Sequence, residues 1–139
     1  MKNILLREAV KYLGTPYKHG ATPEEAPQCF DCSSFIQFIF KKAGVELPRR
    51  SDWQAQCGIK ISGIKNLLPG DLLFFEGNKK RSRLVMVGGQ QIWIGHVAMY
   101  LGNSKTIHCT NKNQLGVSVR SLEKAGKKIV LIKRVLPNT

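Results

Sequence analysis

The fold of this chain is decided by the segment DCSSFIQFIFKKAG, residues 31–44. Asp31 is a favourable N-cap residue, the apolar run after it is typical of a buried helix, and Gly44 lies where a C-terminal cap belongs. Cys32 would then be the first residue inside the helix, where unpaired N–H groups and the helix dipole favour a negative charge. A thiol there is expected to ionise more readily, and the thiolate is the nucleophile of cysteine chemistry. The segment predicts either a catalytic nucleophile or a packed, inert thiol.

Two histidines are candidate partners for this thiol. Residues 95–102 and 105–110 alternate between apolar and polar side chains as strands do, and turn residues lie between them. If the strands pair as a hairpin about Asn103, His96 and His108 lie on one face as diagonal neighbours, about 7–8 Å apart between Cα atoms. One imidazole could then act as the base, while the other fixes its tautomer by bonding the second ring nitrogen.

Several short segments of the chain come in the order and approximate spacing of one known family. They are LGTPYKHG at 13–20, DCSSF at 31–35, LPRRS at 47–51, PGDLLFF at 69–75, GHVAMYLG at 95–102, IH at 107–108 and RVL at 134–136. Together they resemble the NlpC/P60 family of cell-wall peptidases, and the resemblance covers almost the whole chain.

The resemblance implies an α+β, papain-like fold in which the nucleophile helix packs on a central antiparallel β-sheet. It implies a cysteine peptidase that hydrolyses peptidoglycan stem peptides, typically at the γ-D-glutamyl to diamino-acid bond, through a thiolate and an acyl-enzyme. The competing interpretation is a non-catalytic module on the same fold that binds the cell wall or another polyanion. Since all three catalytic positions hold competent residues, the peptidase is the preferred interpretation.

The resemblance also assigns roles to residues at matching positions. It makes Cys32 the nucleophile, His96 the base and His108 the orienting third member of a Cys-His-His triad. The hydroxyl of Tyr17 would hold the oxyanion together with the backbone N–H of Cys32. The remaining two positions, which would line the site for the D-glutamyl group, are Asp31 and Ser33.

The chain departs from the family pattern in two places. Ser34 stands where the family usually has a glycine, which is expected to narrow the pocket. Residues 76–95 form a longer connection than usual, in which 84–87 and 91–94, split by two glycines, predict an inserted hairpin. This insertion is interpreted either as a surface excursion without a role or as one wall of the substrate groove, because it leads directly into His96.

Length and composition fit a single domain over residues 1–139. A chain of this length with 42% hydrophobic residues can bury a core without a disulfide or metal. A short amphipathic helix is expected at 3–13 and a loop at 60–68. Strands are expected at 72–75, 96–101, 105–110, about 116–120 and about 128–135.

Positive charge is concentrated in the second half of the chain. Residues 77–139 carry twelve Lys and Arg against one acid, giving +11, whereas residues 1–76 carry ten against eight, giving +2. Such a surface predicts an anionic partner: peptidoglycan with its attached anionic polymers, nucleic acid or membrane lipid. No helix-turn-helix, RNP or zinc-finger pattern supports specific nucleic-acid recognition. The alternative is that these side chains only keep the protein in solution.

CxxC spacing is typical of a redox pair or of half a zinc site. Cys29 and Cys32 have CxxC spacing, but a zinc site would need a second close pair, and Cys57 and Cys109 are far apart. No metal or other cofactor is therefore expected, and the unpaired thiols favour a reducing compartment. No signal peptide or transmembrane segment is evident. We expect a protein that is cytoplasmic on synthesis and stays there unless it is exported by a non-Sec route or released by lysis.

Overall fold

The computed structural model describes residues 1–78, 82–126 and 128–136, so the basic residues Lys79, Lys80 and Arg81 of the insertion lie outside the described part. The helices are α1 Lys2–Lys11, α2 Cys32–Lys42, α3 Ser51–Gln54 and α4 Leu122–Gly126, with 3-10 turns at Pro23–Glu25, Ile64–Asn66 and Lys112–Gln114. The strands are β1 Ile59–Lys60, β2 Leu72–Glu76, β3 Arg83–Val87, β4 Gln90–Gly102, β5 Lys105–Thr110, β6 Gly116–Ser121 and β7 Ile129–Arg134.

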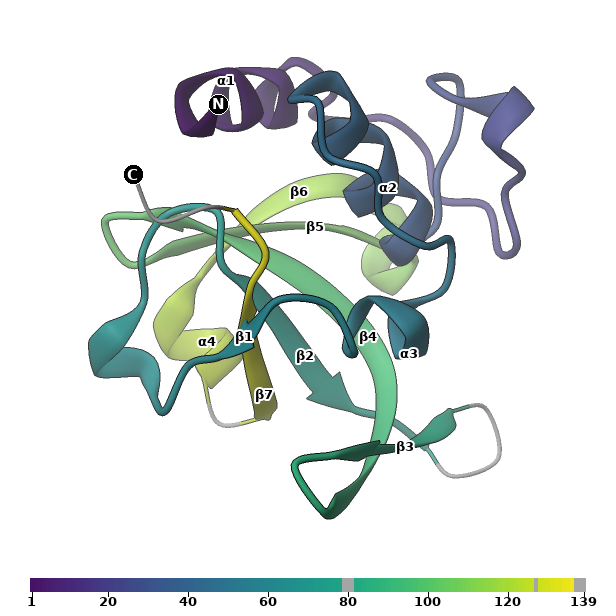
Figure 1. Ribbon diagram of the computed structural model, residues 1–139. Coiled ribbons are helices and arrows are strands. Elements are labelled where there is room, and N and C mark those ends of the chain that lie inside the picture. The colour runs from purple at the N-terminus through teal and green to yellow at the C-terminus, as the bar shows by residue number, and fades with distance from the viewer. Residues whose placement is uncertain (79–81, 127, 137–139) are drawn as a thin grey trace.

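These strands form one antiparallel sheet in the order β1-β7-β2-β4-β5-β6, and β3 pairs with β4. The helices α1 and α2 lie together on one side of the sheet, and α4 lies beside β5 and β6 away from them (Figure 1). The expected α+β fold, with the helix that begins at Cys32 packed on an antiparallel sheet, is therefore confirmed.

The larger apolar core fixes α2 on the sheet. Phe35 and Ile39 of α2 are fully buried with Phe74 of β2, Val97 of β4 and Ile107 of β5. A second, smaller core lies on the other face of the sheet. It consists of Leu73, Phe75, Ala98, Ala125 and Ile132. Because successive side chains of a strand point to opposite faces, Val97 lies in the larger core and Ala98 after it lies in the second core.

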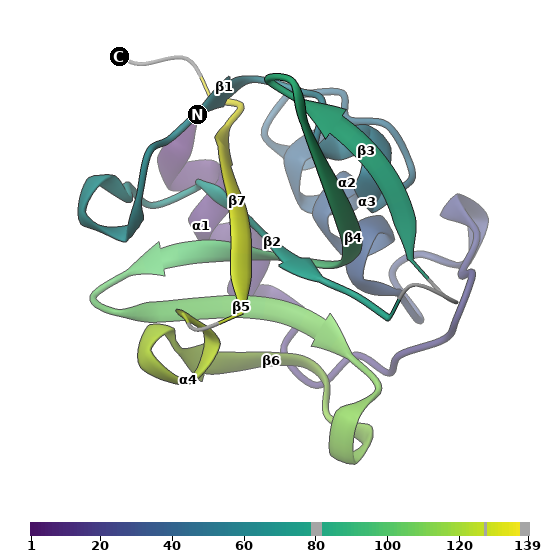
Figure 2. The same cartoon turned by 90° about the horizontal axis from the view of Figure 1, so that it is seen from below.

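The insertion before His96 is a hairpin, as predicted. Gly88 and Gly89 form its two-residue turn with φ of 56° and 79°, and both values suit a tight hairpin turn. The two strands expected at 91–94 and 96–101 are one continuous strand, β4, that bends from its pairing with β3 to its pairing with β5 (Figure 2).

One edge of β4 has an interruption in its pairing. Ile94 pairs with β2 and also with β3, so these two strands lie on opposite edges of β4. On the β3 edge, β3 pairs with Gln90–Ile94 and β5 pairs with β4 from Met99 onward, so residues 95–98 have no strand partner on this edge among the described residues. We call residues 95–98 on this edge the β4 gap.

Two glycines cross where the insertion begins and ends. A Cβ atom added to Gly95 would lie 2.4 Å from the Cα of Gly77, and one added to Gly77 would lie 2.5 Å from the Cα of Gly95. Only residues without a side chain allow backbones to approach this closely. The register between β2 and β4 also shifts here, between the Phe75–His96 and Glu76–Ile94 pairs.

Other elements differ from expectation in small ways. The first helix ends at Lys11 rather than at residue 13, and the expected loop at 60–68 contains the end of β1 and a 3-10 turn. The short helices α3 and α4 were not expected, because four or five residues carry too little periodicity to predict a helix.

Candidate active site

The start of α2 is fixed by its own side chains. The Asp31 carboxylate accepts the backbone N–H of Ser34 at 2.8 Å, and the Ser34 hydroxyl accepts the backbone N–H of Asp31 at 2.9 Å. This reciprocal cap confirms the predicted helix start, with Cys32 as first helical residue. Because the Ser34 hydroxyl bonds back to the cap, this residue stabilises the helix start where a glycine could not.

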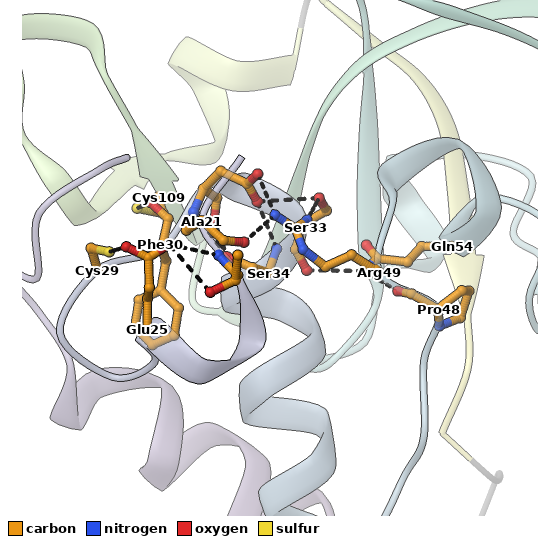
Figure 3. A network of polar contacts seen from close by, with 12 residues as sticks. Ala21, Glu25, Cys29, Phe30, Ser33, Ser34, Pro48, Arg49, Gln54 and Cys109 are labelled. Carbon is orange, nitrogen blue, oxygen red and sulfur yellow. Dashed lines mark hydrogen bonds and ion pairs between the residues drawn. The ribbon is translucent and has the colours of Figure 1, made fainter. Parts of the chain in front are cut away.

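Arg49 joins the cap from the loop that follows α2. Its guanidinium donates to Asp31 Oδ2 at 2.7 Å, to Ser33 Oγ at 2.9 Å and to the Ala21 carbonyl at 2.6 Å (Figure 3). Asp31 and Ser33, the predicted substrate contacts, are thus held by each other and by Arg49, and the Asp31 side chain is only 13% exposed. Sequence analysis missed this use of Arg49, although the residue lies in the LPRRS segment.

Gln54 fastens the same loop to α2. It is fully buried, and its side-chain nitrogen donates to the carbonyls of Ser33 at 3.0 Å and Pro48 at 2.8 Å (Figure 3). Nothing in the sequence around this glutamine distinguishes it from a surface residue. Its contacts keep the loop that carries Arg49 at the start of the helix.

The sulfur of Cys32 lies against β4. The backbone N–H groups of Ser33 and Val97 lie near it and favour its ionised form. Val97 lies in the β4 gap, between the ends of β3 and β5, where α2 meets β4. The gap therefore brings the candidate nucleophile to the residue that follows His96.

The two histidines are neighbours, as the predicted hairpin requires. His96 Nε2 lies 2.8 Å from His108 Nδ1, with ring centroids 5.0 Å apart. The Met99–Ile107 and Tyr100–Thr106 pairs fall in the predicted register. Within the described part of the chain, no hydrogen bond joins the Cys32 sulfur to the His96 ring, and such bonds often tighten only when substrate binds.

Burial decides the charge of this site in the resting state. It raises the pKa of the Cys32 thiol to about 11, with Asp31 acting in the same direction. The expectation of an easily ionised thiol is therefore wrong for the unliganded protein, because desolvation outweighs the N–H groups at the helix start. Burial and then the charges of His108 and Arg120 lower the pKa of His96 to about 3, and burial and then the charge of Arg120 lower that of His108 to about 4. At neutral pH the thiol and both imidazoles are uncharged.

Tyr17 reaches the same place through an isolated bridge. Tyr17 pairs with Phe30, and the backbone N–H of Lys18 donates to the Phe30 carbonyl at 2.9 Å. Burial and then the proximity of Cys32 and Asp31 raise the pKa of the Tyr17 hydroxyl. The hydroxyl accordingly remains a hydrogen-bond donor beside the thiol.

The other cysteines have separate environments. The Cys29 thiol donates to Glu25 Oε2 at 3.7 Å, and the buried Cys109 thiol donates to the Phe30 carbonyl at 3.4 Å (Figure 3). All four cysteines are free. Within residues 1–78, 82–126 and 128–136, no group of three or more His, Cys, Asp or Glu is arranged to hold a metal ion. Among the same residues, no helix is long and apolar enough to span a bilayer.

A family model described as the NlpC/P60 family matches residues 14–134. The chain belongs to the NlpC/P60 family. Its sequence is 35% identical over 132 residues to gamma-DL-glutamyl hydrolase of Bacillus subtilis, covering 94% of this chain and 28% of that protein. It is 34% identical over 119 residues to the bifunctional muramidase/DL-endopeptidase CwlT of the same organism, covering 86% and 31%.

Solved structures of NlpC/P60 domains share the fold. The peptidoglycan hydrolase RipB of Mycobacterium tuberculosis superposes with a TM-score of 0.71 at 25% identity, covering 99% of this chain and 65% of that one. The chain thus spans less than a third of the two curated relatives named above and about two thirds of this solved structure.

Proposed function

We propose that this NlpC/P60 chain is a cysteine peptidase that hydrolyses peptidoglycan stem peptides at the γ-D-glutamyl to diamino-acid bond. The relatives named a glutamyl hydrolase, a DL-endopeptidase and a peptidoglycan hydrolase support the substrate class. The observation that carries the proposal is the position of the Cys32 sulfur against Val97, the residue directly after His96. The Nε2 atom of His96 is in turn hydrogen-bonded to His108.

In the proposed acylation, His96 acts as the base through Nδ1. This leaves the hydrogen of its neutral ring on Nε2, which donates to His108 Nδ1, so His108 fixes both tautomer and orientation. The thiol proton passes to His96 while the sulfur attacks the γ-carbonyl carbon of the D-glutamyl residue. The oxyanion accepts hydrogen bonds from the Tyr17 hydroxyl and the backbone N–H of Cys32.

The remaining steps return the enzyme to its starting state. His96 gives its proton to the amine of the diamino acid as the C–N bond breaks, which leaves a thioester on Cys32. Water then attacks the thioester while His96 accepts a proton from it. The product leaves with its γ-carboxyl group, and the thiolate of Cys32 recovers its proton from His96.

The uncharged resting site affects the timing of proton transfer. With the pKa of Cys32 at about 11 and that of His96 at about 3, a thiolate–imidazolium pair is disfavoured before substrate binds. We propose that the proton moves together with the attack on the carbonyl, as in general-base catalysis, rather than in advance of it.

The proposal is tested by incubating the protein with purified muropeptides and searching for new amines by mass spectrometry. The expected products are a fragment that ends in D-glutamate and a fragment with a new amino terminus on the diamino acid. A Cys32→Ala variant that folds normally serves as the control and should give neither fragment. Cleavage at another bond would change the assigned specificity, and no cleavage would refute the peptidase.

A non-catalytic wall-binding module remains the second candidate function. The high pKa of Cys32 and the lack of a direct Cys32–His96 hydrogen bond among the described contacts favour it. The same assay separates the two functions, because a module of this kind would sediment with cell-wall sacculi without releasing amines. We further propose that the excess of Lys and Arg in residues 77–139 attracts the anionic polymers of the wall.

A further inference from the structure

Arg120 lies on the histidine side of the sheet. It pairs with Thr106 across β5 and β6, two positions from the His108–Ser118 pair and therefore on the same face. Its guanidinium carbon lies 5.4 Å from the centre of the Phe75 ring, which in turn lies 5.5 Å from that of His96. The face thus presents a ring, two imidazoles and one cation side by side.

This cation has no acidic partner among the described residues. Their ion pairs engage Lys11, Lys18, Arg49, Arg50 and Arg134, but not Arg120. The Nε atom of Arg120 is buried without a hydrogen-bond acceptor, although a buried donor of this kind is costly to leave unpaired. One donor of this partly buried arginine is therefore desolvated without an acceptor, while its guanidinium is placed against the Phe75 ring.

The proposed reaction brings substrate to this side. The leaving amine must approach His96, because it receives its proton from that ring. The diamino-acid half of the stem peptide consequently lies on the side of His96 and Arg120. Arg120 also opposes the protonation of His96 that the reaction requires, and an anion bound to its guanidinium would offset this repulsion.

We propose that Arg120 binds a carboxylate carried by the diamino-acid half of the stem peptide, and that this contact selects the substrate and assists proton transfer to His96. The inference rests on the proposed function and deepens it. The carboxylate can belong to the main-chain terminus of the diamino acid or to its side chain, since the guanidinium fork accommodates either in the same way.

The test uses three tripeptides that share L-Ala-γ-D-Glu and differ only in the third residue. The first ends in L-lysine with a free carboxylate, the second in L-lysine amide, and the third in a diaminopimelic acid whose main-chain carboxyl is amidated and whose side-chain carboxyl is free. Wild-type protein should cleave at least one carboxylate peptide with a kcat/KM about 10- to 100-fold above that of lysine amide. The preferred peptide identifies the source of the carboxylate.

Variants then assign the preference to Arg120. In Arg120→Gln the ratio between the preferred peptide and lysine amide should fall to about 1, and Arg120→Lys should retain part of it, because lysine keeps the charge but loses the fork. The matched control Lys124→Gln removes an exposed positive charge from the adjoining helix α4 and should leave the ratio unchanged.

Two outcomes would overturn the inference while sparing the proposed function. In one, wild-type protein cleaves all three peptides with equal kcat/KM. In the other, Arg120→Gln lowers kcat/KM for all three by the same factor, as a purely structural residue would. Failure of wild-type protein to cleave any stem peptide would instead refute the proposed function, and with it the inference.

Discussion

The helix side and the sheet side of the candidate site differ in whether their charged groups are paired. At the start of α2, Asp31, Ser33 and Arg49 bond to one another, so each charge has its partner before any ligand arrives. On the sheet, His96 and His108 are uncharged, and Arg120 beside them has no acidic partner among the described residues. The charged groups around the nucleophile are therefore paired within the protein, whereas the proposed partner of Arg120 beside the base is a carboxylate of the substrate.

The largest effect is expected on the helix side, from the nucleophile itself. Cys32→Ala should lower hydrolysis of a stem peptide by about a million-fold, because no other group can form the thioester. Its melting temperature should stay close to that of wild type, since alanine is tolerated in the first helical turn. The matched controls Cys29→Ala and Cys57→Ala should retain most activity. Equal loss in Cys29→Ala and Cys32→Ala would support a redox or metal role for the CxxC pair.

On the sheet side, the base should matter next. His96→Ala should lower kcat by about 10²- to 10⁴-fold, the range of general acid–base assistance. His108→Gln should retain more activity than His108→Ala, because an amide can still bond the His96 ring. Steady-state kinetics on one soluble peptide provides all three values. A His96→Ala variant with wild-type kcat would separate the imidazole from the reaction.

The protein should lose stability when the ion pair between Asp31 and Arg49 on the helix side is removed. Asp31→Ala removes the cap and leaves Arg49 unpaired, so we expect a loss of about 3 kcal/mol in the free energy of unfolding. Urea titration measures this loss, and Glu24→Ala, which removes an exposed acid, is the matched control. The Asp31→Ala/Arg49→Met double variant should lose less than the two single changes together. Strict additivity would show that the two side chains act independently.

The sheet side should respond to pH. Folded pKa values of about 3 for His96 and about 4 for His108 lie below the value of about 6.5 of an unfolded histidine. Between these values the unfolded chain binds more protons, so stability is present above pH 6.5 and decreases as pH falls. The slope should approach at most about 1.4 kcal/mol per pH unit for each histidine. Urea midpoints from pH 7 to pH 5 should show it, and His108→Gln should reduce it.

The smallest effect concerns the basic second half and lies outside both sides of the site. Replacement of Lys79, Lys80, Arg81 and Arg83 by Gln should weaken sedimentation with sacculi and spare turnover of a small peptide. Wild-type binding should weaken with salt, because the screening length decreases from about 10 Å at 0.1 M to about 3 Å at 1 M. If the variant bound sacculi as wild type does, the basic side chains of this segment would have no role in wall binding. Loss of peptide turnover would make it part of the site.

The sequence predicts contacts between residues that are close along the chain better than contacts between distant residues. The helix start depends on Asp31 and the residues directly after it, so local capping rules located it correctly. The histidine pair depends on one hairpin, whose Met99–Ile107 and Tyr100–Thr106 pairs lie in the predicted register although the pairing shifts between Tyr100 and Gly102 next to the turn. Arg49 and Arg120 could not be assigned, because Arg49 meets Asp31 across 18 residues and Arg120 meets Phe75 of β2 from β6.

The expectation of a low pKa for the Cys32 thiol is wrong for the same reason. A local rule places the thiol at a helix start, where N–H groups favour the thiolate. Burial of the thiol, which no local pattern shows, raises its pKa instead. The sequence identified which groups meet, but not how much water remains around them.

The crossing of Gly77 and Gly95 has a consequence for how this chain can diversify. The inserted hairpin begins and ends at one crossing, because the two backbones meet there almost in contact, while its strands stay in the sheet and bury Val85, Val87 and Ile92 in the larger core. Its tip can therefore lengthen, shorten or be exchanged while β2 and the His96 end of β4 keep their register. A bulkier residue at either glycine would push the two backbones apart and shift the strand next to His96. The part of the insertion that is free to vary is thus its tip at Gly88 and Gly89, where an added Cβ atom would meet no other atom within 4 Å.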